Sequence, residues 1–199
     1  MRASHAMRQW PGMRGLAGMR SLVFALLTCG WTAALAGGEV EVNTVVAEFI
    51  NDILHVSSAQ RLAFSDEALE ALESGIPLTL EFNVEVRRER RYVWDKVLTE
   101  TTQRFRIERH SLSDRYLVTN VTTGDRESFY GVIDAVDSLQ QIEKLPVAER
   151  RALPLNEPVL VALRVRLDRD ALPAPIRATG WFSSAWKMES DWFITGLSS

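Results

Sequence analysis

Four arginines and two aromatic residues lie within eight positions of one another, and this run has the clearest chemical potential in the sequence. Arginine pairs bidentately with carboxylate or phosphate, while tyrosine and tryptophan favour surfaces that are apolar on one side and wet on the other. The run predicts a contact surface for an anionic membrane or an acidic patch on a partner protein. The alternative is a solvated strand edge that discourages edge-to-edge pairing. The residues are Arg87, Arg88, Arg90, Arg91, Tyr92 and Trp94.

Three tryptophans near the C-terminus form a second candidate, namely Trp181, Trp186 and Trp192. Exposed together, they would make an aromatic platform for a ligand or a belt at a membrane interface. The alternative interpretation is that these large rings close one end of the hydrophobic core.

Enzymatic chemistry has weak support in the sequence. His55 and His110 are the two histidines after residue 36, and no Gly-x-Ser-x-Gly motif accompanies them. Asp134 and Asp137 are three residues apart but fall away from the nearby apolar stripe, which indicates a solvated face rather than an acid/base pair. We therefore expect a protein with no catalytic residue, no metal site and no cofactor.

The first 36 residues have the composition of an export signal. Four arginines precede an apolar segment, residues 21–35, that is shorter than the ~20 residues of a spanning helix. Ala34 and Ala36 supply the small-x-small pattern that signal peptidase accepts, so we expect cleavage after Ala36 and a periplasmic mature chain. The alternative is an uncleaved segment that anchors the protein in the inner membrane. The true start remains open among Met1, Met7, Met13 and Met19.

Removal of this leader changes the character of the chain. It takes away the single cysteine, Cys29, with four of the 23 basic residues and none of the 26 acidic ones. The mature chain, residues 37–199, thus has a formal charge of −7 and no thiol, which excludes disulfides and cysteine-ligated metals. An acidic exported domain is also a poor nucleic-acid binder, so we expect no nucleic acid among its partners.

Hydrophobic periodicity predicts the elements that position these residues. Period-two alternation predicts strands at 39–49, 53–64, 116–121, 159–167 and 190–194, and a long hairpin at 77–112 with the arginine run at its tip. Helices are expected at 65–75, with Ser65 as N-cap and Gly75 at its end, and at 128–145, where apolar residues recur at helical spacing. The predicted fold is mainly β (α+β): an antiparallel β-sandwich or strongly curved sheet of about seven strands with one short and one longer helix.

Several segments resemble, in the same order, the DUF4390 family of exported proteobacterial proteins. They are residues 66–80, the arginine-rich tip, residues 115–118 and 172–177, and the ending from Trp186 to Trp192. The resemblance implies a single domain over the mature chain and assigns no activity or site residue. We expect family members to be encoded near genes for a sensor kinase like those of nitrogen regulation and for its response regulator, which implies an envelope or signalling link.

The sequence thus favours a non-enzymatic periplasmic binding or interaction module, accessory to an envelope sensor-kinase system. Its partner would be a protein or an anionic membrane surface, and its oligomeric state is open. The alternative is a carrier that holds a small apolar ligand between the sheet and the long helix, in a cavity lined by Val132, Val136 and Leu163.

Overall fold

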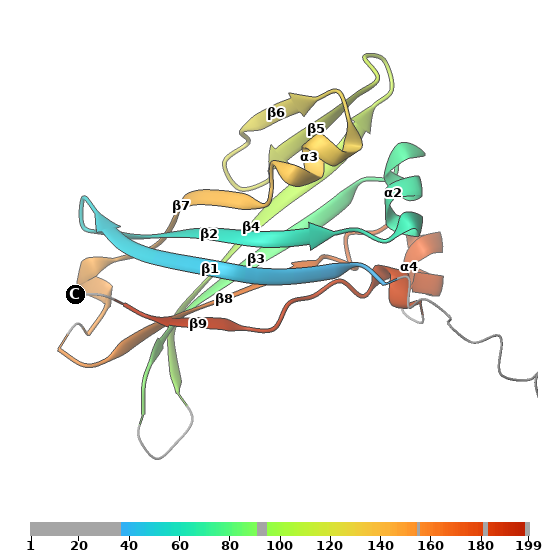
Figure 1. Ribbon diagram of the computed structural model, residues 1–199. Helices are drawn as coiled ribbons and strands as arrows, with labels where there is room; N and C mark the ends of the chain where they lie inside the picture. The colour runs from blue at the N-terminus through green and yellow to red at the C-terminus, as the bar shows by residue number, and fades with distance from the viewer. Residues whose placement is uncertain (1–36, 91–94, 155, 181–182, 198–199) are drawn as a thin grey trace, which may run out of the picture. The chain divides into compact units, whose positions relative to one another are not determined.

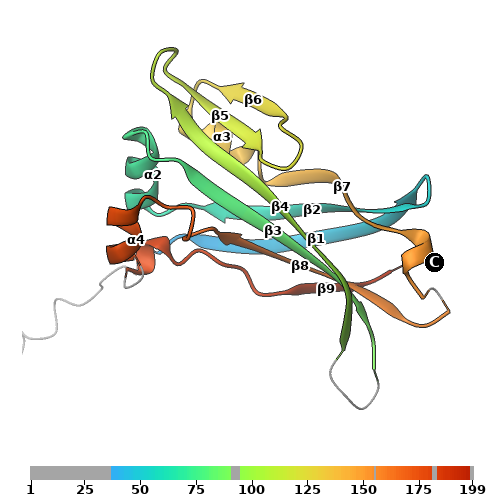
Figure 2. The ribbon, with the colours of Figure 1, turned by 180° about the vertical axis from the view of Figure 1, so that it is seen from behind.

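Two antiparallel sheets make up the fold, as Figures 1 and 2 show from opposite sides. The computed structural model describes residues 37–90, 95–154, 156–180 and 183–197, all within one compact unit, Leu35–Ser199. The smaller sheet has the strand order β1-β2-β7 and the larger one β6-β5-β4-β3-β8-β9. This confirms the predicted antiparallel sandwich, with nine strands in the described residues. The strands are β1 (Glu39–Ile50), β2 (Ile53–Ala63), β3 (Leu78–Arg88), β4 (Lys96–His110), β5 (Arg115–Asn120), β6 (Arg126–Phe129), β7 (Gln141–Glu149), β8 (Val159–Leu167) and β9 (Phe193–Gly196).

The hydrophobic core lies between the two sheets. Alternate residues of β3, from Leu78 to Val86, are fully buried, and Leu54 and Val56 of β2 are equally buried in the other sheet. Phe82 on β3 contacts Phe105 on β4 edge to face, with ring centroids 5.3 Å apart. Each fully buried side chain of this size contributes about 1.5–3 kcal/mol, so these strands supply the main cohesion of the fold.

Short helices close the ends of the strands. Ser65 caps α2 (Asp66–Glu73) as predicted: its Oγ accepts a hydrogen bond from the Ala68 N–H and donates one to the Ala185 carbonyl. Gly75 has a φ of 87°, which suits glycine at the end of a helix. Helix α4 (Ala174–Gly180) and the 3₁₀ turns η1 (Arg150–Ala152) and η2 (Ser184–Trp186) were not predicted.

The long helix predicted at residues 128–145 is wrong. This stretch contains β6, the six-residue helix α3 (Val132–Asp137) and most of β7. A bulge explains the misleading periodicity: Val56 pairs with Leu145 and Ser58 with Ile142, so three steps along β7 oppose two along β2. Lys144 adopts a left-handed φ of 54° at this bulge. Ile142 and Leu145 are therefore both buried although they are three residues apart, a spacing typical of a helix.

The last strand begins later than predicted. Ser190 occupies the position where the ladder with β8 would start, and its Oγ accepts a hydrogen bond from the Val165 N–H at 3.0 Å. Only an isolated bridge between Arg166 and Glu189 precedes it, so regular pairing begins at Leu163 and Phe193. Strand β9 thus spans Phe193–Gly196 rather than residues 190–194.

Candidate functional site

The β3–β4 hairpin carries the predicted arginine run, and the two views show its arms extending beyond the neighbouring strands (Figures 1 and 2). Arg87 and Arg88, the last residues of β3, are held by the body of the domain. Arg87 donates from Nε to Glu85 at 2.7 Å, with both side chains less than one-fifth exposed. Arg88 forms an ion pair with Glu157 at 2.9 Å. Arg87 is thus paired within β3, whereas Arg88 links the end of β3 to the segment that precedes β8.

The remaining described cations of the hairpin face solvent. Arg90 is exposed, and its backbone N–H donates to Asp95 at 3.2 Å, which links the two arms. Lys96 and Val97 at the start of β4 are also exposed, Val97 by 45%. Among the described residues, neither the Arg90 nor the Lys96 side chain has an ion-pair partner. The other predicted members of the surface, Arg91, Tyr92 and Trp94, lie outside the described residues.

The structure separates the tryptophans that the sequence grouped. Trp186 is only 3% exposed in the core, and its indole N–H donates to Glu67 of α2 at 2.9 Å. Trp192 instead lies between two guanidinium groups: those of Arg87 and Arg164 are 4.7 and 4.5 Å from its ring centroid. Trp181 lies outside the described residues. Trp186 therefore closes the core, and Trp192 stabilises the outer face of the larger sheet through cation–π contacts.

A buried carboxylate on that outer face was missed by the sequence interpretation. Glu81 alternates with the core residues of β3, yet it is only 2% exposed. Arg104 on β4 donates to its Oε1 and Arg166 on β8 to its Oε2, each through two nitrogens at 2.6–2.8 Å. Alternation alone places Glu81 on the polar face, but only the strand order shows that arginines on both neighbours cover it.

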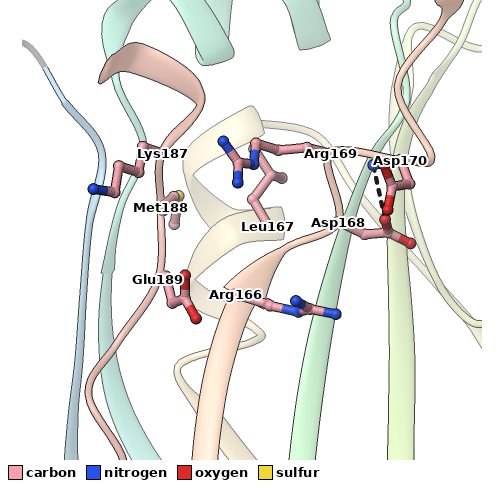
Figure 3. A pocket seen from close by; sticks show the side chains of 8 residues that line it. All are labelled: Arg166, Leu167, Asp168, Arg169, Asp170, Lys187, Met188 and Glu189. Atoms are coloured by element: carbon pink, nitrogen blue, oxygen red, sulfur yellow. Dashed lines mark hydrogen bonds between the residues drawn. The ribbon is translucent and has the colours of Figure 1, made fainter. Parts of the chain in front are cut away.

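A small polar pocket lies at the end of β8 (Figure 3). Its volume is about 120 Å³, and it lies between the turn after β8 and the segment from Lys187 to Glu189. Arg169 extends toward Met188 in Figure 3, and Asp168 accepts a hydrogen bond from the Asp170 N–H at 3.0 Å. The lining holds three basic and three acidic side chains. This balanced pocket is far smaller than the ~300–1,000 Å³ typical of small-molecule sites.

The remaining candidates for chemistry are the two histidines and the two aspartates of α3. His55 Nδ1 lies 3.0 Å from the Ile53 carbonyl, and His110 Nδ1 lies 2.9 Å from Ser113 Oγ. Asp134 and Asp137 are exposed on α3, as predicted. In the described ranges, no group of three or more His, Cys, Asp or Glu side chains is arranged to hold a metal ion.

Among the described residues, the pKa of Arg109 is shifted from its ordinary value. Arg109, near the end of β4, donates from Nε to Asp114 at 2.9 Å and from Nη1 to the Glu73 carbonyl at 2.6 Å. The hydrogen bond to Asp114, followed by the negative charge of Asp114, raises the pKa of Arg109 above its ordinary value. These contacts fasten the β4–β5 turn to α2 and create no reactive group.

The fold is a two-sheet antiparallel β domain that carries clusters of charged and aromatic side chains. The chain matches the family model described as "Domain of unknown function (DUF4390)" over residues 38–195, and it belongs to this family. No curated protein and no solved structure shows significant similarity to it. Across the described ranges, no helix has both the length and the apolar character required to cross a bilayer.

Proposed function

We propose that the mature domain is a non-enzymatic periplasmic binding module that contacts its partner through the β3–β4 hairpin. The observation that supports this most directly is the exposure of Arg90, Lys96 and Val97 on arms that extend beyond the neighbouring strands. An exposed apolar side chain flanked by exposed cations suits an acidic protein surface or an anionic membrane. The leader of residues 1–36 supports a periplasmic location.

Of the predicted arginines, we propose Arg90, together with Lys96, as the cations that would contact the partner. Arg87 and Arg88 are engaged by Glu85, Trp192 and Glu157, so their charge reversal would disturb the domain itself. Arg90 and Lys96 lie on opposite arms, and neither side chain has an ion-pair partner in the part of the chain that the structure describes. The link to an envelope sensor-kinase system remains part of the proposal and rests on the expected setting of the family's genes.

A photo-crosslinking residue in place of Val97 tests the proposal in intact cells. We expect one dominant crosslinked product and expect it to be lost in the double variant Arg90→Glu, Lys96→Glu. The matched control is Arg106→Glu, Lys187→Glu, which reverses two exposed cations remote from the turn of the hairpin and should retain the product. Both double variants should unfold at the same urea concentration as the parent.

Vesicle sedimentation distinguishes the two kinds of partner. A protein partner predicts a crosslink of defined mass and no binding to phosphatidylglycerol vesicles. A membrane partner predicts salt-sensitive binding to phosphatidylglycerol but not to phosphatidylcholine vesicles, lost in the hairpin variant only. If neither crosslink nor vesicle binding depends on Arg90 and Lys96, the hairpin is not the contact surface.

The alternative function, a carrier for a small apolar ligand, depends on a cavity beside a long helix. In place of that long helix, the structure has the six-residue helix α3 followed by β7. Leu163 is fully buried and Val136 is only 5% exposed. The binding module is therefore the better supported of the two proposals.

A further inference from the structure

A groove opens between β5 of the larger sheet and β7 of the smaller sheet. The strand pairings place Leu78, Ile107, Val118 and Glu127 in one row across β3, β4, β5 and β6. Residues directly opposite each other share a face of the sheet. Leu78 and Ile107 are fully buried and Val118 is 6% exposed, whereas Glu127 is exposed. The inner face thus changes from aliphatic to acidic toward its edge.

Strand β7 forms the opposite wall of this groove. Within the described residues β7 pairs with β2 alone, and its Ile142 and Leu145 are buried while Glu143 is exposed. The space between β7 and β5, here called the β5–β7 groove, has a volume of about 260 Å³. Phe105, Val118 and Ile142 are among its apolar lining residues, and Asp125, Glu127 and Glu143 supply three carboxylates with no basic residue in the lining.

The backbone of β7 is poorly shaped for the addition of another strand. Lys144 has a left-handed φ, and Pro146 lacks the N–H that a ladder requires. The Val147 carbonyl, farther along β7, already accepts a hydrogen bond from Thr101 Oγ1 on β4 at 3.2 Å. An occupant must therefore use side-chain contacts rather than extend the sheet. The volume admits one large side chain and lies below the ~300–1,000 Å³ of most small-molecule sites.

We propose that the β5–β7 groove binds a partner polypeptide segment in which one large apolar side chain is flanked by lysine or arginine. The apolar side chain fills the space beside Phe105, Val118 and Ile142, and the flanking cations pair with the three carboxylates. This second site is independent of the hairpin. Phe105 and Val97 are eight residues apart on β4, which separates the two surfaces by about 26 Å.

Selection from a library of short random peptides displayed on phage tests this site. The bait is the protein purified from cells, and the double variant Glu127→Lys, Glu143→Lys is used to remove peptides that bind elsewhere. We expect net-positive peptides with a central aromatic or aliphatic residue. The selected peptide, synthesised with a fluorescent label, should bind the double variant roughly tenfold more weakly, because two charge pairs become like-charge contacts.

The control variant is Glu48→Lys, Glu70→Lys, which changes the net charge equally at two exposed positions on β1 and α2. It should bind the peptide as the parent does, and higher salt should weaken binding to both. Selection of acidic or neutral peptides, or equal binding to both double variants, would overturn the proposal. The proposal would also be overturned if the parent selects no peptide and the groove variant self-associates. The carboxylates would then serve only to keep the sheet edge from pairing. If the crosslink at Val97 does not depend on Arg90 and Lys96, only the proposed function fails, because Val97 lies outside the groove.

Discussion

Glu81 and Arg104 face each other across β3 and β4, and the Arg104 guanidinium donates to Glu81 Oε1 from both Nε and Nη2, at 2.8 and 2.7 Å. Arg166 does the same to Oε2 from the other neighbouring strand. One carboxylate, 2% exposed, thus joins three strands of the larger sheet on the face away from the core. The side chains of its two arginine partners are nearly half exposed, so solvent reaches the guanidinium groups but not the carboxylate.

Glu81→Gln should lower the free energy of unfolding by about 2–3 kcal/mol. The substitution keeps the side-chain size but removes the carboxylate that both guanidinium groups share, and Arg104 is left with Asp168 at 3.8 Å. Breaking a buried pair costs more than losing a surface pair. Urea unfolding followed by circular dichroism measures the change. Glu100→Gln, at an exposed position on β4, is the control and should stay within about 0.5 kcal/mol of the parent. Equal losses in the two variants would contradict a structural role for Glu81.

Trp192→Ala should destabilise the domain by about 1–2 kcal/mol, because two guanidinium groups lose the ring between them. Trp192→Phe keeps an aromatic face and should recover about half of the loss. The measurement is again urea unfolding, at low and at moderate salt. If phenylalanine restores nothing, the indole contributes through its own burial rather than through contact with the arginines.

Lys144→Val should destabilise the domain by about 1–2 kcal/mol. Lys144 has a φ of 54°, which a β-branched residue adopts at high cost, and its N–H donates to Ser57 Oγ at 3.0 Å. Lys144→Asn should remain within about 0.5 kcal/mol of the parent, because asparagine tolerates the left-handed region. Thermal unfolding of both variants measures the cost of the left-handed backbone at residue 144. Equal melting temperatures for the valine and asparagine variants would show that the backbone of β7 relaxes to accommodate valine.

Protein purified from its native host should begin at Gly37, as intact-mass measurement will show. Ala34→Asp should block cleavage and leave the precursor in the membrane fraction, because signal peptidase requires a small residue at this position. Leu35→Gln, at the intervening position, should be processed normally. A full-length parent protein in the membrane fraction would instead support the inner-membrane anchor.

The sequence predicted the parts of the fold that depend on neighbouring residues along the chain. Strict alternation identified β3 and β8, and the polar side chain of Ser65 identified the start of α2. Features that depend on pairing between strands were missed. The bulge at Lys144 gave a strand the periodicity of a helix. The burial of Glu81 was not predicted, because its two arginine partners lie 23 and 85 residues away. The β5–β7 groove was also missed, because its walls come from strands in different sheets whose relative position the sequence does not indicate.

The position of β8 has a kinetic consequence. This strand lies beside β3 and carries three of the fully buried core residues, Val161, Leu163 and Val165, yet it begins at Val159. Until that point is synthesised, β3 lacks a neighbour on one side and the core lacks a central layer. A chain whose core depends on such distant contacts folds slowly and late. The nascent chain would thus remain incompletely folded until synthesis is nearly complete, and the proposed export requires a chain that has not yet folded.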